Sequence, residues 1–274
     1  MRLLEGQIAE RADENFVVHA TWVVARTAGM TARISEELVI ADSGLACDTF
    51  NFVCRARLEP STTEEAASAA VAHFAGQPRP FSWWVGPADQ PRDLGAVLER
   101  LGLERAEAEL AMAMPLGQLA RAIPEVPGLE VRRVTRADEL EAFARLSAAN
   151  WTPPDPDVIA FYDLAAPALL APHSPQWLYV GYVDGEPVAT AEATVVDGTV
   201  GLYNISTLIS YRGRGIGSQM TWRPLRDALA RGADLGVLQA APDGVGVYRR
   251  LGYRTFGDIT EFKPRRHRAA EERT

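Results

Sequence analysis

The chain has 274 residues, of which 47% are hydrophobic and 23% charged, so it is long enough for two domains with hydrophobic cores and lacks the composition of a disordered protein. Its net charge of -8 disfavours nucleic acid and anionic membranes as partners, because both require a clustered basic face. The one basic cluster, Lys263–Arg268, is interpreted as a solvated tail after the last strand.

The cysteines and the N-terminal region indicate the cellular compartment. Cys47 and Cys54 are seven positions apart in a predicted strand, where side chains an odd number apart point to opposite faces, so no disulfide is expected. The chain opens without a signal-peptide pattern, and no apolar run reaches the 18 or so residues needed to span a bilayer. We therefore expect a cytoplasmic protein in a reducing compartment.

The first part of the chain, residues 1–115, is predicted to form one domain. Helices are expected over 3–15 and 93–101 and in an alanine-rich stretch that ends near Phe74, and strands at 38–41, 48–58, 81–85 and 104–114. An aromatic and β-branched run, His19–Val24, follows the first helix. The strand 104–114 is expected to close this unit.

A linker rich in proline and glycine, residues 116–128, precedes a second predicted domain, residues 129–264, and a charged tail, residues 265–274. Strands are expected at 129–134, 177–183, 187–196, 199–207, 235–240 and 253–262, and helices at 135–148, capped by Thr135, 158–170, 216–231 and 245–251. Asp184-Gly185 and Asp197-Gly198 are typical of tight antiparallel hairpins. The fold class is therefore α+β with a mixed, mostly antiparallel sheet flanked by helices, and not a repeated βαβ unit.

A glycine-rich turn between a strand and a helix, Tyr203–Ser218, is the strongest candidate for an anion site. Backbone N–H groups and the positive end of a helix dipole meet at such a turn. The phosphate-binding loop of nucleoside triphosphatases is excluded, because Ser218-Gln219 follows Gly217 where that loop needs Lys then Ser or Thr. The dinucleotide fingerprint is disfavoured, because its third glycine position falls on Ser218 or Met220.

The pattern Arg212-x-x-Gly215-x-Gly217, after a strand and opening a helix, resembles the acyl-CoA pyrophosphate motif of the GNAT superfamily of N-acetyltransferases. Tyr203-Asn204-Ile205 before it and Val247–Tyr253 after it occur in the same order as in that family, so the resemblance covers the whole second domain. It implies acetyl-CoA as the acyl donor and, together with the internal repeat described below, two tandem acyl-CoA N-acyltransferase folds in the α+β class. The implied cofactor-binding residues are Ile205, Ser206, Thr207, Arg212, Gly213, Arg214, Gly215, Ile216, Gly217 and Ser218.

Amine acetylation needs a neutral amine, a path for its proton, and a donor for the departing thiolate. The resemblance implies that Tyr248 is this donor, and the alternative is a core aromatic residue of a short helix. Ala241 stands where many relatives have an asparagine that contacts the cofactor. Glu192, in a strand of small residues, is the candidate base, and the alternative is a solvent-facing strand residue.

The segment between the first two helices of the second domain lies where relatives bind their acceptor. Trp151, Asp155 and Asp157 are candidate acceptor-binding residues, although helix capping would also explain both aspartates. The four histidines are scattered and form no ligand set with the cysteines, so no metal site is expected.

An internal repeat links the two predicted domains. Val97–Leu103 aligns without a gap on Val247–Tyr253, with Leu98 in the place of Tyr248, and Phe50–Cys54 resembles Tyr203–Thr207. Because no glycine follows in residues 55–65, the first domain is interpreted as a degenerate GNAT half.

The predicted function is acetyl-CoA-dependent N-acetylation of a primary amine of a small-molecule acceptor by direct transfer. The alternative is a non-catalytic acyl-CoA-binding sensor. We expect no metal, no nucleic-acid partner and no membrane partner. The protein is expected to be a monomer or a homodimer.

Overall fold

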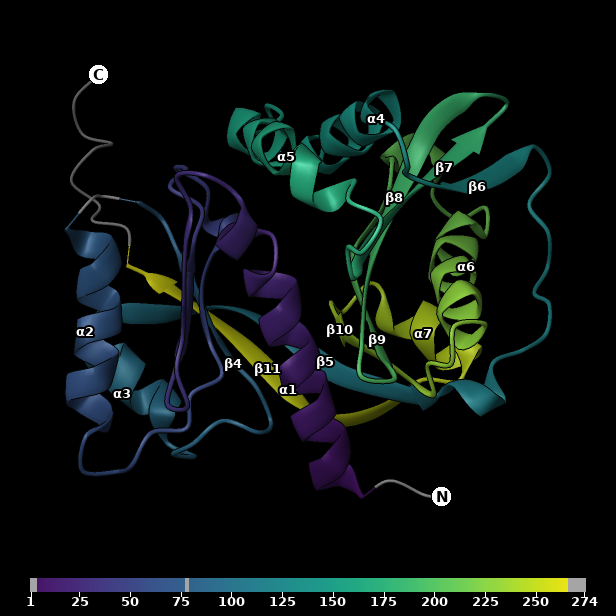
Figure 1. The fold of residues 1–274 in the computed structure, drawn as a ribbon. Coiled ribbons are helices and arrows are strands. Elements are labelled where there is room, and N and C mark those ends of the chain that lie inside the picture. Colours follow the sequence, from purple (N-terminus) through teal and green to yellow (C-terminus); the bar gives the residue numbers. More distant parts are fainter. Residues whose placement is uncertain (1–3, 77–78, 266–274) are drawn as a thin grey trace.

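The computed structural model describes residues 4–76 and 79–265, whose strands form one continuous eleven-stranded sheet in the order β1-β2-β3-β4-β11-β5-β10-β9-β8-β7-β6 (Figure 1). The first part of the chain contains α1 (Glu5–Thr21), β1 (Thr31–Ile34), β2 (Val39–Asp42), β3 (Asn51–Cys54), α2 (Thr63–Ala75), β4 (Ser82–Val85), α3 (Leu94–Arg100) and β5 (Leu103–Pro115). The second contains β6 (Leu129–Arg133), α4 (Ala137–Ala148), α5 (Pro156–Leu169), β7 (Gln176–Val183), β8 (Glu186–Val196), β9 (Thr199–Thr207), α6 (Ile216–Leu229), β10 (Leu235–Ala240), α7 (Val245–Leu251) and β11 (Arg254–Pro264). Residues 266–274 of the predicted tail lie outside the described part.

The predicted fold class is confirmed, and several local expectations are wrong. The strand expected at 48–58 is a 3₁₀ turn over Asp48–Phe50 followed by the short β3. The first helix continues to Thr21, because Phe16, Val17 and Ala20 continue its buried face, so the run from His19 ends a helix and enters a 3₁₀ turn. Strand β1 lacks buried residues and was not predicted. Thr135 does not cap α4: the Glu139 carboxylate instead accepts hydrogen bonds from the backbone N–H groups of Thr135 and Arg136.

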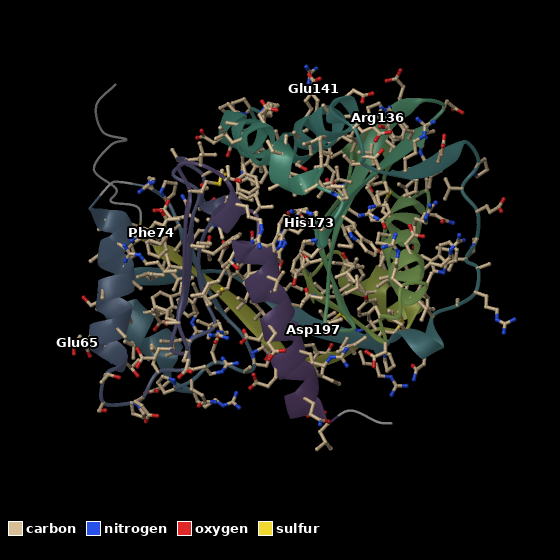
Figure 2. All side chains as sticks on the ribbon, viewed as in Figure 1. Glu65, Phe74, Arg136, Glu141, His173 and Asp197 are labelled. Atoms are coloured by element: carbon tan, nitrogen blue, oxygen red, sulfur yellow. The ribbon has the colours of Figure 1, made fainter. Side chains whose placement is uncertain are left out.

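Helices cover the sheet on both sides of its centre. α1 crosses the middle of the molecule and contacts β2, β8, β9 and β11, so it joins the two parts of the chain (Figure 1). On α2, Phe74 faces the sheet and is 1% exposed, whereas Glu65 points outward into solvent (Figure 2). This division of apolar and charged faces is what the alanine-rich amphipathic sequence of α2 predicts.

The two halves exchange their last strands. β5 does not close the first unit as expected, because β11 lies between it and β4 and pairs antiparallel with both. On its other side β5 pairs antiparallel with β10. β11 follows β10 in the chain, so β5 occupies the place that β11 would take if the second half closed on itself. The division at residues 115 and 129 stays a prediction, and the sheet runs across it without a break.

The central β5–β11 ladder displays the internal repeat. Glu104 pairs with Lys263, and Ala113 pairs with Arg254. Glu104 and Arg254 are 150 positions apart, as are Ala113 and Lys263, and this is also the separation of Val97 and Val247 in the repeat. The two register shifts, Thr255/Gly257 and Glu261/Phe262, are related in the same way. The ladder therefore has a pseudo-two-fold axis, as expected for a duplicated unit.

The register corrects one part of the predicted repeat. The parallel pairs β9–β10 and β3–β4 end at Leu202↔Leu238 and at Val53↔Trp83. Two residues after Leu202 and Val53 the chain has a non-glycine residue at positive φ, Asn204 (φ 49) in β9 and Arg55 (φ 52) directly after β3. Val53 therefore corresponds to Leu202, and the predicted match of Phe50–Cys54 with Tyr203–Thr207 is displaced by several residues.

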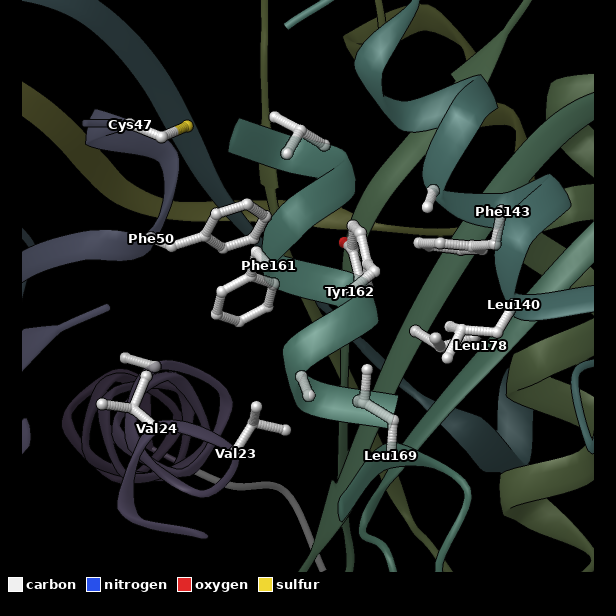
Figure 3. Packing of buried hydrophobic residues seen from close by; sticks show 14 of the residues in the cluster. Val23, Val24, Cys47, Phe50, Leu140, Phe143, Phe161, Tyr162, Leu169 and Leu178 are labelled. Atoms are coloured by element: carbon white, nitrogen blue, oxygen red, sulfur yellow. The ribbon is translucent and has the colours of Figure 1, made fainter. Parts of the chain in front are cut away.

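A shared hydrophobic core holds the halves together. One cluster of buried residues combines Phe50 and Val24 of the first half with Phe143, Phe161 and Tyr162 of the second (Figure 3). The rings of Phe50 and Phe161 stack with centroids 3.6 Å apart and planes 4° apart. The cluster brings α5 against the end of α1 and the 3₁₀ turn that follows it.

Candidate active site

The glycine turn before α6 has the geometry of an anion cradle. Gly213 (φ 77) and Gly215 (φ 86) adopt the left-handed conformation that favours glycine. Among the described residues, the backbone N–H groups from Gly213 to Gly217 have no hydrogen-bond acceptor. A Cβ atom added at Gly213 or Gly217 would meet nothing within 4 Å, so the turn is open to a ligand.

Two exposed arginines flank the cradle. Arg212 donates from Nε to the Thr207 carbonyl at 3.0 Å, and Arg214 donates to the Ser210 carbonyl at 3.0 Å while its guanidinium lies over the Tyr211 ring. These contacts use part of each guanidinium and leave the remaining donors exposed. The positive charge next to the free N–H groups suits a diphosphate.

Beyond Leu202, β9 and β10 diverge. The pairing of β9 with β8 continues to Thr207, whereas no described strand pairs with the opposite edge of Ile205–Thr207. The Ser206 hydroxyl donates to Asn150 Oδ1 at 2.8 Å, which ties this edge to the segment after α4. An unpaired strand edge is the structure to which an extended amide-bearing chain can add.

The corresponding edge of the first half is already occupied. The Ala56 N–H donates to Asp89 Oδ1 at 2.7 Å, the Gln90 N–H donates to the Ala56 carbonyl at 2.9 Å, and the Leu58 N–H donates to the Gln90 carbonyl at 3.1 Å. The chain thus fills, in the first half, the position that stays unpaired beside β9. The open edge and the glycine cradle occur together in the second half.

A cavity of about 640 Å³ opens where β9 and β10 diverge. Leu202, Tyr203 and Asn204 of β9 and Gln239 of β10 line it at that point. Its walls are aromatic on several sides, with contributions from Phe16, Phe52, Trp84 and Trp151. Most of these walls come from the first half, so both halves build the cavity.

The cavity is acidic. Its lining includes the carboxyl groups of Asp48, Glu107, Glu109, Asp155 and Glu261. Lys263 of β11 is the one lysine in the lining, and its Nζ lies 3.1 Å from Asp48 Oδ2 and 3.1 Å from Glu261 Oε1. Burial, together with the neighbouring carboxylates of Glu107 and Glu261, raises the pKa of Glu109 to about 7.

The predicted acceptor residues are only partly brought together. Trp151, which is 40% exposed, and Asp155 both line the cavity, whereas Asp157 does not. Asp155 also caps α5, because its carboxylate accepts from the Asp157 N–H at 2.9 Å. Asp157 lies in the first turn of α5, where a carboxylate interacts favourably with the helix dipole.

Glu192 is buried and not exposed on the strand face. Its Oε2 accepts from Asn204 Nδ2 at 2.8 Å, and its Oε1 lies 3.0 Å from His19 Nδ1 on α1. The His19 ring stacks on Tyr203 with centroids 3.7 Å apart. His19 was missed by sequence reasoning, because 173 residues separate it from Glu192 and no local pattern joins them.

Tyr248 lies on α7 and outside the lining of the large cavity. Burial, and then the nearby Glu109 carboxylate, raise the pKa of Tyr248 to about 12. Its ring packs on Gly244, where a Cβ atom would come within 2.8 Å of Cε2, and lies edge-on to Tyr253. The phenol therefore keeps its proton at neutral pH.

Two further features of the described residues bear on the class of protein. No helix among them combines the length and apolar character required to cross a membrane. Within the same residues, no group of three or more His, Cys, Asp and Glu side chains has the arrangement of a metal site.

The comparisons with known proteins agree with this geometry. Residues 116–239 match the family model described as an acetyltransferase (GNAT) domain, a match that ends before Tyr248. Among solved structures, the chain is similar to a GCN5-related N-acetyltransferase from Kribbella flavida, with a TM-score of 0.70 and 23% identity over 94% of this chain and 97% of the other. No curated protein matches the sequence.

Two further structures share the fold at lower identity. A GCN5-related N-acetyltransferase from Sphaerobacter thermophilus has a TM-score of 0.59 at 14% identity, over 95% of this chain and 93% of the other. A tandem GNAT protein from the clavulanic acid biosynthesis pathway has a TM-score of 0.58 at 13% identity, over 93% of this chain and 94% of the other. Residues 116–239 therefore match a GNAT acetyltransferase domain, and the chain as a whole shares the fold of a tandem GNAT protein.

Proposed function

We propose that the protein is an acetyl-CoA-dependent N-acetyltransferase that transfers an acetyl group directly to a primary amine of a small molecule. One observation supports this proposal: beyond Leu202, where Tyr203 and Asn204 line the acidic cavity, β9 continues with an unpaired edge toward the segment that ends in the open glycine turn before α6. The match of residues 116–239 to the GNAT acetyltransferase domain supports the same activity.

On the donor side, the free N–H groups from Gly213 to Gly217, with Arg212 and Arg214, would bind the pyrophosphate of acetyl-CoA, whereas the Ser218 N–H already donates to the Gly215 carbonyl at 3.1 Å. The helix dipole of α6 adds about 0.3–2 kcal/mol for an anion at this end. The edge of Ile205–Thr207 would pair with the amides of the pantetheine arm. The thioester would then reach the cavity from the side of β9.

On the acceptor side, the carboxylates of the cavity attract an ammonium group, and Trp151 and Asp155 would contact the acceptor from the segment before α5. Tyr248 would protonate the departing thiolate, because its raised pKa keeps the phenol protonated. Glu192, which is buried, would take part in removing the proton from the acceptor amine.

The proposal is tested by the release of free CoA thiol from acetyl-CoA over a panel of amines. Tyr248→Phe should reduce kcat about 10-fold or more without changing the KM for acetyl-CoA. Full turnover in this variant would remove the assigned role of the tyrosine. Stabilisation of the protein by CoA without acetyl transfer to any amine would instead favour a binding module.

The cradle is tested by Gly215→Val, which places a strained β-branched residue at φ 86. Gly232→Val, at φ 92 beyond the other end of α6, is the matched control. We expect the first variant to lose CoA binding in calorimetry and the control to retain it. Equal CoA affinity in the two variants would contradict the cradle.

A further inference from the structure

The carboxylate of Glu192 is separated from the cavity in which an acceptor would bind. Both of its oxygens are engaged, one by Asn204 Nδ2 and the other by His19 Nδ1. Glu192 is 4% exposed and lines a small cavity of about 20 Å³, not the large one. Glu192 is therefore badly placed to contact an acceptor amine.

His19 stands between Glu192 and the large cavity and lines both cavities. Because a carboxylate only accepts, its contact assigns the proton of the neutral imidazole to Nδ1 and leaves the lone pair on Nε2. Among the described residues Nε2 has no hydrogen-bond partner. An imidazole with one nitrogen held by a carboxylate and the other free has the arrangement of a general base.

The position of His19 is fixed by both halves. Its ring stacks on that of Tyr203 with centroids 3.7 Å apart, and the Phe16 ring packs beside both, 5.8 Å from His19 and 5.9 Å from Tyr203. Its backbone carbonyl accepts a hydrogen bond of 2.7 Å from Gln176 Nε2 at the start of β7. A base held by stacking, a carboxylate and a backbone tie loses little entropy when it acts.

We propose that His19, contributed by the degenerate first half, is the general base of the reaction, and that Glu192 is a positioning residue that holds its Nδ1–H. This inference rests on the proposed N-acetyltransferase activity and concerns how its amine is activated. It assigns to the first half a chemical role in addition to forming the cavity wall.

The step balances as follows. His19 Nε2 takes one proton from the acceptor ammonium, and the freed nitrogen lone pair forms the C–N bond to the acetyl carbon. The C–S bond breaks and the CoA thiolate takes a proton from the Tyr248 phenol. The second proton lost by the nitrogen restores the phenol through solvent, and the imidazolium releases its proton to water.

The decisive variant is His19→Gln, with His173→Gln as the matched control. Among the described residues, Trp22 is the one aromatic ring that His173 contacts, and His173 lines neither cavity. We expect His19→Gln to lower kcat about 100-fold or more while the KM for acetyl-CoA and the CoA-induced thermal shift stay unchanged. Glu192→Gln should lower kcat by roughly 10-fold. Full turnover in His19→Gln would overturn the proposal, as would a larger loss in Glu192→Gln than in His19→Gln.

The pH profile adds a readout that a structural role would not move. In His19→Gln, kcat/KM should rise in proportion to the neutral amine as pH increases, whereas the wild type should level off. The titratable groups around the ring are Glu192 from β8, Tyr203 from β9 and Tyr162 from α5, while β3 presents Phe52. Parallel profiles for the two proteins would contradict the assignment.

A spectroscopic test separates this inference from the proposed function. In ¹⁵N-histidine spectra, the His19 signal, identified by its loss in His19→Gln, should have the Nδ1–H tautomer in the wild type and change in Glu192→Gln. A proton on Nε2 instead of Nδ1 would refute the His19–Glu192 hydrogen bond even if the enzyme is active. A wild type that shows the expected tautomer and acetylates no amine would refute the proposed function and leave the Glu192 contact intact.

Discussion

Replacing Glu109 by glutamine should stabilise the protein at alkaline pH. Glu109 has its pKa raised from 4.5 to about 7, so between these values the folded state holds a proton that the unfolded chain gives up. Stability contributed by this group therefore falls as pH rises through that window. One pKa unit corresponds to about 1.4 kcal/mol, so the full shift sets an upper bound of about 3.5 kcal/mol, and partial exposure to the cavity reduces this to roughly 1–2 kcal/mol.

The assay is urea denaturation of the wild type and Glu109→Gln at pH 5 and pH 8. The variant should gain about 1–2 kcal/mol in the free energy of unfolding at pH 8 and show little difference at pH 5, where Glu109 is protonated. Glu104→Gln, on the exposed part of the same strand, is the control and should change neither value. A loss of stability in Glu109→Gln at pH 8 would refute the repulsion between the cavity carboxylates.

Three further predictions follow from the cavity and the core. Calorimetry should measure one CoA per chain, because the chain itself occupies the corresponding edge of the first half at Ala56 and Leu58, and two equivalent sites would contradict this. In CoA-release assays Glu107→Gln should raise the KM for 1,5-diaminopentane about 10-fold and leave the KM for 1-aminopentane nearly unchanged. The reason is that only the diamine keeps a positive charge when its reacting nitrogen is neutral. Equal effects on the two KM values would argue that the carboxylates of the cavity do not bind the acceptor. Phe161→Ala should cost about 3–5 kcal/mol in denaturant unfolding, and a loss below 1 kcal/mol would mean that the Phe50 stack does not join the halves.

Local patterns in the sequence were sufficient for the features that depend on neighbouring residues. The glycine turn, the Asp-Gly hairpins and the strand at Leu235–Ala240 follow from backbone preferences over a few positions. The alignment of Val97 with Val247 also held, because a helix end followed by a left-handed glycine has a short signature, repeated at Gly102 and Gly252.

What the sequence did not predict depends on distant partners. Alternation of residues along β5 fits an edge or a central strand equally well, so it does not identify β10 and β11 as its neighbours. Glu192 was expected either in the cleft or on a solvent-facing surface. Its buried position depends on contact with His19, which lies on a helix near the other end of the chain and could not be paired with it from the sequence. The roles of the predicted site residues stay predictions until the variants above are measured.

The exchange of β5 and β11 makes the order of synthesis matter for folding. β11 follows every other strand in the chain, yet it inserts between β4 and β5 near the middle of the sheet. The edge of β4 therefore stays unpaired until residue 264 has been made, and the first half has no complete sheet before then. Such non-local pairing is slow, so this protein should depend on protection of that edge during synthesis more than a protein of two independently closing domains.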